Sequence, residues 1–201
     1  MTDTTPVARR TVIAGAGAGV LAALTSTETQ AQTAAAKPEA VASEFYVRKG
    51  DTQLYVYRKR VIPAAGETQP VLFLVHGSSN SSRSSYDLAV PGAKGEYSMM
   101  NVFASYGFDI WTMDHDGYGR SGWSGGNSDI ASGVEDLKAA LPVVLRESGA
   151  QKVHMYGTSS GAIRAGAYAQ VQPDRVDRLV LSAFTYKGTG SPEIARRNAV
   201  A

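Results

Sequence analysis

The 201-residue sequence contains no cysteine. Disulfide bonds, thiolate nucleophiles and cysteine-ligated metal sites are therefore excluded. It also has no large excess of one charge, because 20 Lys and Arg residues and 18 Asp and Glu residues leave a formal net charge of +2. So small a charge, on scattered basic residues, argues against a nucleic-acid partner. With 43% hydrophobic and 19% charged residues, the composition is that of one soluble globular domain.

Long hydrophobic runs are also missing, and the mildly apolar stretch Val12–Leu24 is too short to span a bilayer comfortably. Arg9 and Arg10 precede this stretch, and small residues suited to cleavage follow it. This is the three-part layout of a secretory signal, and the paired arginines resemble a twin-arginine signal. We therefore expect residues 1–36 to be a cleaved signal peptide. The protein would then be exported, to the periplasm or outside the cell, without a stable membrane anchor.

The remaining residues, 37–201, alternate short apolar runs with longer amphipathic ones. This alternation predicts βαβ units, hence a mostly parallel, doubly wound α/β sheet with helices on both faces. Alternating residues around Lys49-Gly50-Asp51 predict a hairpin with one solvent-exposed face. Pro142 is expected to kink or shorten the long helix that contains it. The predicted strands are 44–48, 53–58, 71–75 (buried on both faces), 108–113, 152–156 and 178–183. The predicted helices are 97–106, 161–170 and a long helix that is capped by Ser128 or Asp129, reaches Ser148 and stops at Gly149.

The sharpest chemical signal is Gly157-Thr158-Ser159-Ser160-Gly161, which follows a predicted strand and precedes a predicted helix. A nucleophilic serine has to stand out from the sheet on a sharp turn, and the flanking glycines leave room for that turn. We therefore predict that Ser159 is a nucleophile and that Gly157 and Gly161 form its elbow. The alternative is a turn of the kind found in any doubly wound protein. A second match to the pattern, residues 122–126, lies among polar loop residues, so Ser124 is expected to be a loop serine.

The predicted strand 71–75 ends in His76-Gly77-Ser78-Ser79. Acyl transfer needs two backbone N–H groups aimed at the developing oxyanion, one after the nucleophile and one on an earlier loop. Here the chain resembles the α/β-hydrolase family, in which a His-Gly pair after the third strand introduces the oxyanion residue. The resemblance implies an oxyanion hole formed by Ser78 and Ser160, with Ser79 as the near alternative to Ser78. It gives His76 a structural role in shaping the loop.

The stretch 114–121, Asp-His-Asp-Gly-Tyr-Gly-Arg-Ser, is similar to a loop after the fourth strand of many lipase, esterase and peptidase relatives. The resemblance implies a tight surface loop held by hydrogen bonds of its Asp and Arg. His115 is expected to be a loop residue, which could line the pocket, rather than a catalytic base. Tyr86 and Trp123 are expected to shape a pocket for a small ester or amide. The activity implied is that of a serine hydrolase that uses neither a cofactor nor a metal.

The family's catalytic triad follows the chain order serine, acid, histidine. No histidine follows Ser159, and the acids after it are Asp174, Asp177 and Glu193. The first two belong to a turn where a solvated position is the natural interpretation. We expect residues 37–201 to be the N-terminal portion of an α/β-hydrolase domain, without its C-terminal strands and nearly inactive as it stands. The alternatives are a non-catalytic α/β-hydrolase-like binding protein and a pseudogene remnant.

Overall fold

The computed structural model describes residues 39–184, 190, 195–196 and 199. The expected signal peptide, residues 1–36, lies outside the described residues. Within them, no helix is long and apolar enough to cross a membrane. The elements are β1 Val41–Lys49, β2 Thr52–Arg60, β3 Val71–Val75, α1 Ser82–Tyr86, α2 Met99–Ser105, β4 Asp109–Met113, α3 Ile130–Ser148, β5 Val153–Thr158, α4 Ser160–Val171, the 3₁₀ turn η1 Pro173–Arg175, and β6 Val176–Ser182.

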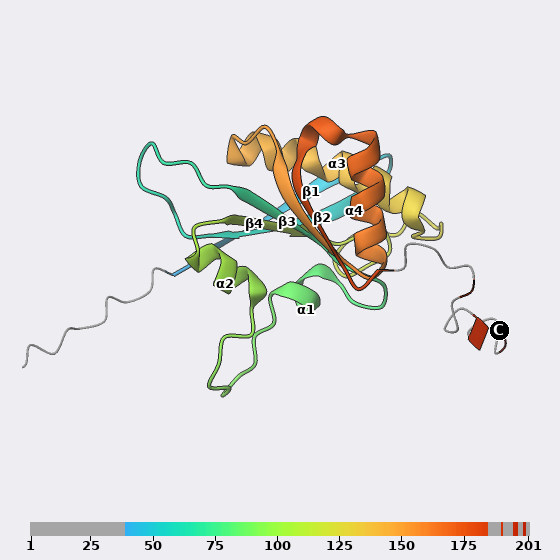
Figure 1. Ribbon diagram of the computed structural model, residues 1–201, viewed down its shortest axis with the longest axis horizontal. Helices are drawn as coiled ribbons and strands as arrows, with labels where there is room; N and C mark the ends of the chain where they lie inside the picture. Colours follow the sequence, from blue (N-terminus) through green and yellow to red (C-terminus); the bar gives the residue numbers. More distant parts are fainter. Residues whose placement is uncertain (1–38, 185–189, 191–194, 197–198, 200–201) are drawn as a thin grey trace, which may run out of the picture. The chain divides into compact units, whose positions relative to one another are not determined.

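The six strands form one sheet in the order β1-β2-β4-β3-β5-β6 (Figure 1). Strands β4, β3, β5 and β6 are parallel to one another, and β1 and β2 add an antiparallel hairpin beside β4. Helices α1 and α2 cover one face of the sheet, whereas α3 and α4 cover the other (Figure 1). The predicted fold class, a mostly parallel α/β sheet with helices on both faces, is confirmed.

Each face of the sheet buries a separate hydrophobic core. On the α3 and α4 face, Phe73 and Val75 of β3 pack with residues of both helices. On the α1 and α2 face, Leu72 and Leu74 of the same strand pack with Tyr86 and with residues of α2. Every residue of β3 is buried, as its unbroken apolar run predicts. The carboxyl end of β3 is thereby held rigidly beside that of β5.

The β1–β2 hairpin forms as predicted, with Lys49 paired to Thr52. The expectation of one solvent-exposed face is wrong for β2, in which Tyr55 is 0% and Tyr57 3% exposed. This strand lies inside the sheet, between β1 and β4, and its tyrosine rings join the core on the α1 and α2 face. A tyrosine ring is apolar although its hydroxyl is polar, so an alternation of Tyr with aliphatic residues is compatible with burial on both faces.

Helix α3 begins and ends at its predicted residues. The Asp129 side chain accepts a hydrogen bond from the Ser132 N–H at 2.8 Å, and Gly149 adopts a left-handed φ of 74°. The expected shortening at Pro142 does not occur, because the helix continues to Ser148. Its buried residues on both sides of the proline pack against the sheet and the neighbouring α4, which offsets the one backbone hydrogen bond that a proline removes.

Candidate active site

The structure places Ser159 between the end of β5 and the start of α4, with φ 55° and ψ −127°. A positive φ is rare for a residue with a side chain and marks a strained turn. Neither flanking glycine has room for a side chain. A Cβ on Gly157 would lie 2.5 Å from the Gly161 carbonyl oxygen, and a Cβ on Gly161 would overlap the carbonyl oxygens of Val75 and His76. The turn therefore has the strand–turn–helix geometry of an elbow, packed tightly against β3.

The second Gly-x-Ser-x-Gly match lies in an irregular loop. Residues 122–126 belong to no helix or strand, and Ser124 is exposed. The Ser124 N–H donates to Asp116 Oδ1 at 2.9 Å, which fixes the loop backbone. Ser124 is therefore a loop serine, as its sequence context indicates.

The loop after β3 lies directly against the elbow. A Cβ placed on Gly77 would lie 3.0 Å from the Ser159 Cβ, so this glycine permits the close approach. The Ser78 and Ser160 hydroxyls form a hydrogen bond at 2.9 Å, although 82 residues separate them. Ser79, the alternative to Ser78, has a left-handed φ of 74°. The structure thus brings the predicted oxyanion residues together beside Ser159.

His76 is fully buried beneath this loop. Its Nε2 accepts a hydrogen bond from the His115 N–H at 3.1 Å, so its Nδ1 carries the proton and donates to the Gly77 carbonyl at 2.7 Å. Burial, followed by the electrostatic effect of the neighbouring His115, lowers the pKa of His76 to about 4. A neutral imidazole with both nitrogens engaged supports the loop, which agrees with the structural role expected for His76.

The loop 114–121 is held by its aspartate, as expected. Asp114 accepts hydrogen bonds from the Ser82 N–H at 2.7 Å and from the Arg120 N–H at 2.8 Å. A Cβ on Gly119 would overlap the Asp114 carboxylate. The Arg120 side chain, in contrast, reaches Glu44 of β1 at 2.7 Å. The loop is thereby tied both to the segment after β3 and to the edge of the sheet.

His115 is a loop residue, as expected, but it does not line a pocket, because its side chain is fully buried. Its Nδ1 lies 2.9 Å from Asp136 Oδ2, and Asp136 Oδ1 lies 2.5 Å from Lys49 Nζ. Burial alone would raise the pKa of Asp136, but the hydrogen bonds from His115 and Lys49 outweigh burial and lower it. Burial lowers the pKa of His115 more than the Asp136 hydrogen bond raises it, so the imidazole is neutral.

Sequence reasoning missed the roles of Lys49 and Asp136. The sequence pattern places Lys49 only at a hairpin turn. In the structure its Nζ also lies 2.9 Å from Asp116 Oδ2. Asp136 does carry a signal in the sequence. It lies three residues after Gly133 and four before Ala140, both of which are buried on α3. An aspartate on the buried stripe of a helix requires a partner inside the protein, and here the partners are Lys49 and His115.

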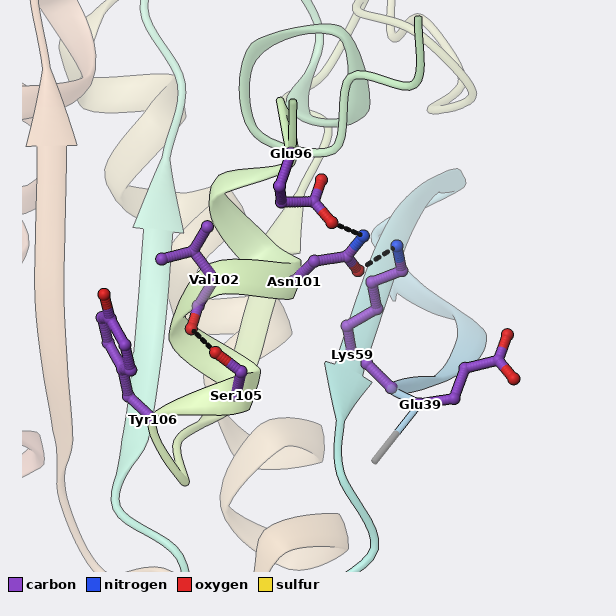
Figure 2. A pocket seen from close by; sticks show the side chains of 8 residues that line it. Glu39, Lys59, Glu96, Asn101, Val102, Ser105 and Tyr106 are labelled. Carbon is purple, nitrogen blue, oxygen red and sulfur yellow. Dashed lines mark hydrogen bonds between the residues drawn. The ribbon is translucent and has the colours of Figure 1, made fainter. Parts of the chain in front are cut away.

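Hollows lie near both ends of the parallel strands. One, of about 470 Å³, lies between the start of β1, the end of β2 and α2. Figure 2 shows a chain of three polar side chains in this hollow, because Asn101 accepts from Lys59 at 2.7 Å and donates to Glu96 at 3.0 Å. Lys59 pairs with Ile110 near the start of β4, which places this hollow away from the carboxyl end where Ser159 lies.

The other hollow, of about 450 Å³, lies at the loops after β4, on the edge of the sheet that carries Ser159. Trp123, which is 72% exposed, lines it together with Asp116, Tyr118 and Ser128. Tyr86, the other residue expected to shape a pocket, is buried in the core and donates to the Val75 carbonyl at 2.8 Å. Ligands of open α/β sheets bind at this carboxyl edge.

The remaining candidate acids lie on the surface or outside the described residues. Asp174 belongs to the exposed η1 turn, and Asp177 Oδ2 lies 3.2 Å from His154 Nδ1 on a side chain that is 50% exposed. Both positions are exposed, as expected, but Asp177 lies in β6 rather than in the turn that precedes it. Glu193 lies outside the described residues. Among the residues described, no group of three or more His, Cys, Asp or Glu side chains has the arrangement of a metal site.

Comparisons with known proteins agree with this fold. Residues 66–197 match the family model described as serine aminopeptidase, S33. A 2-hydroxy-6-oxononadienedioate/2-hydroxy-6-oxononatrienedioate hydrolase of Paraburkholderia phymatum is 32% identical over 160 residues, which are 77% of this chain and 48% of that protein. The chain thus spans about half the length of the curated relatives it matches.

Solved structures of hydrolases share the fold at low sequence identity. A CIB-like hydrolase from Thermoplasma acidophilum matches with a TM-score of 0.55 and 18% identity, over 75% of this chain and 67% of that one. A hydrolase from Pseudomonas aeruginosa matches with a TM-score of 0.55 and 21% identity, over 78% of this chain and 52% of that one. At these identities the likeness concerns the fold alone.

Proposed function

The chain belongs to the α/β-hydrolase family described as serine aminopeptidase, S33, and from that premise we propose that it carries the nucleophile and oxyanion hole of an exported serine hydrolase. The observation that carries the proposal is the strained turn at Ser159, packed against the loop that holds Ser78. In the proposed reaction the Ser159 hydroxyl attacks a substrate carbonyl carbon. Its proton passes to a base, and the tetrahedral oxyanion that results expels the leaving group, which takes up that proton. Water then hydrolyses the covalent acyl-enzyme that remains.

The oxyanion formed in that step needs two hydrogen-bond donors. Ser160 is the first residue of α4, so its N–H has no acceptor within the helix. The Ser78 N–H is the proposed second donor, on the loop that Gly77 brings against Ser159. The hydrogen bond between the Ser78 and Ser160 hydroxyls fixes the spacing of the two donors. Removal of one such donor in a serine hydrolase typically slows turnover by a factor of roughly 10²–10³.

None of the three histidines in the sequence is placed to be the base. His76 and His115 are fully buried, and their Nδ1 atoms are bonded to the Gly77 carbonyl and to Asp136, respectively. His154 lies on β5, five residues before Ser159, and a strand rises about 3.3 Å per residue, so the two are roughly 16 Å apart. We propose that the base and its acid belong to the whole protein, in a part beyond the 201 residues. The 201-residue chain would then be nearly inactive.

The proposed substrate is a small ester or amide, which a Ser159 acyl-enzyme would hydrolyse. A second candidate is favoured by the relatives, whose substrates by name carry a 6-oxo group and two carboxylates rather than an ester. Hydrolysis at a ketone breaks a carbon–carbon bond, and the attack on a carbonyl carbon is shared with ester hydrolysis. A third hypothesis, a non-catalytic binding protein with the same fold, predicts turnover of neither the ester or amide nor the 6-oxo compound.

A substrate comparison on the whole protein tests these proposals. We expect turnover of p-nitrophenyl acetate or of a 2-hydroxy-6-oxo-dienedioate, and loss of at least about 10³-fold in kcat in Ser159→Ala. Ser124→Ala is the matched control, because it removes a serine from the second Gly-x-Ser-x-Gly match, and it should keep full activity. Turnover that survives Ser159→Ala would refute the nucleophile assignment. No turnover of any carbonyl substrate would favour the binding protein.

A further inference from the structure

Arg164 is a buried arginine on α4, five residues after Ser159. Its exposed fraction is 1%, and its stem packs so closely on α3 that a Cβ on Gly133 would lie 2.6 Å from the Arg164 Nε. One guanidinium nitrogen, Nη2, donates to the Ser128 carbonyl at 2.5 Å. The other two, Nε and Nη1, have no hydrogen-bond partner in the part of the chain that the structure describes. Such a buried charge requires further acceptors.

His115 supplies a second unpartnered atom in the same region. Because Asp136 is ionised and accepts from Nδ1, the other ring nitrogen, Nε2, presents a lone pair, and no described residue donates to it. The His115 ring lies 4.8 Å from the His76 ring, and the positive charge of Arg164 lowers the pKa of both histidines. The ring of Tyr118 connects them, 5.9 Å from the Arg164 guanidinium and 5.0 Å from the His76 ring.

We propose that a buried water molecule bridges Arg164 and His115, and that Arg164 thereby positions the elbow helix α4 against the loop that follows β4. A water accepts from the guanidinium and donates to the His115 lone pair, so one molecule satisfies both groups. An anion does not fit, because it would meet that lone pair on a ring whose Nδ1 already lies 2.9 Å from the Asp136 carboxylate. Arg164 needs an acceptor and His115 Nε2 needs a donor at the same place, and a water molecule is both.

The bridge connects three segments that lie far apart in the sequence. Arg164 belongs to α4, His115 to the loop after β4, and the Ser128 carbonyl bound by Arg164 directly precedes the Asp129 cap of α3. Since Ser160 is the first residue of α4, a shift of this helix moves the Ser160 N–H as well. The positioning role rests on the proposed function, whereas the water site does not.

A crystal structure of the 201-residue protein, at a resolution that shows ordered water, tests the site directly. We expect a density peak within about 2.7–3.2 Å of Arg164 Nη1 or Nε and of His115 Nε2. An empty site, an anion at this position, or a direct hydrogen bond from Arg164 to His115 would each overturn the proposal. The result does not depend on hydrolysis, so it leaves the proposed function to its own test.

Substitution of Arg164 tests the positioning role in solution. Arg164→Met keeps the stem but removes every donor, and it should lower the melting temperature by roughly 5 °C, whereas Arg146→Met, at an exposed position on α3, should change it by less than about 1 °C. If no water accepted from Nε and Nη1, removal of these buried donors would stabilise the protein and raise the melting temperature. An unchanged or higher melting temperature in Arg164→Met therefore overturns the proposal.

The titration of His115, followed by NMR, separates positioning from simple space-filling. The groups that act on His115 are Asp136 of α3, Asp114 of its own loop and Arg164 of α4. The His115 pKa should rise in Arg164→Met and return toward the parent value in Arg164→Lys, which keeps the charge. Arg164→Lys also serves if the methionine variant does not fold. A His115 resonance that titrates identically in the parent and both variants would contradict the proposal.

Discussion

Replacement of Gly161 by alanine should destabilise the protein, because the new Cβ has no room. It would lie 2.7 Å from the His76 carbonyl carbon and closer still to the carbonyl oxygens of Val75 and His76. These are backbone atoms of the buried β3 and its end, so they cannot rotate aside, and α4 has to move away from the sheet. Overpacking of this kind costs roughly 1–3 kcal/mol, from which the preference of a helix for alanine over glycine subtracts at most about 1 kcal/mol.

A net loss of about 1–2 kcal/mol lowers the melting temperature of a chain of this size by about 2–8 °C. Gly166→Ala is the matched control, because Gly166 lies on the same helix and a Cβ there would meet only Leu181 at 3.8 Å. It should leave the melting temperature unchanged or raise it. Thermal unfolding of the parent and both variants decides the matter. If the two alanine variants melt at the same temperature, the packing argument for the elbow is refuted.

Three further predictions concern the buried charges, the pH dependence and export. Asp136→Asn should lower the free energy of unfolding by about 2 kcal/mol, because it removes the buried charged partner of Lys49. Glu135→Gln, at an exposed position, should lower it by less than about 0.5 kcal/mol. Equal losses for the two variants in denaturant unfolding would contradict the buried network of Lys49, Asp136 and His115. The pKa of His76 is lowered from 6.5 to about 4 in the folded protein, so as the pH falls the unfolded chain takes up a proton at His76 before the folded chain does. The contribution of His76 to stability is therefore complete above pH 6.5 and is lost toward pH 4. The difference in melting temperature between the parent and His76→Gln should therefore narrow over that range, and a constant difference would count against a neutral His76. Replacing Arg9 and Arg10 by lysine should keep the protein in the cytoplasm with residues 1–36 attached, and export equal to that of the parent would rule out the twin-arginine proposal.

The parts of the fold that could be predicted from the sequence are those encoded over short distances. The unbroken apolar run of β3 requires burial on both faces, and the Asp129 cap and Gly149 stop define α3 without reference to the rest of the chain. The elbow is local as well, because its glycines and serine lie within five residues. Its positive φ at Ser159 follows from that local geometry.

The features that could not be predicted depend on partners distant in the sequence. The buried position of His115 depends on its contact with Asp136, which is 21 residues away in the sequence and is itself bound by Lys49 of the hairpin. The burial of Tyr55 depends on which helices cover its face of the sheet. Helix α1 forms in a Ser-rich segment whose sequence has no apolar periodicity, and Asp114 holds its first residue in place. Each of these is a tertiary effect that overrides a local pattern.

The site of a covalent fluorophosphonate adduct, located by mass spectrometry, tests the central claim most directly. On the 201-residue protein we predict slow modification at Ser159, faster modification when imidazole is added as an external base, and none at this position in Ser159→Ala. The acceleration follows because no histidine of this chain is placed to accept the Ser159 proton. An adduct on Ser124 or another residue, or rapid modification of Ser159 without imidazole, would contradict the account.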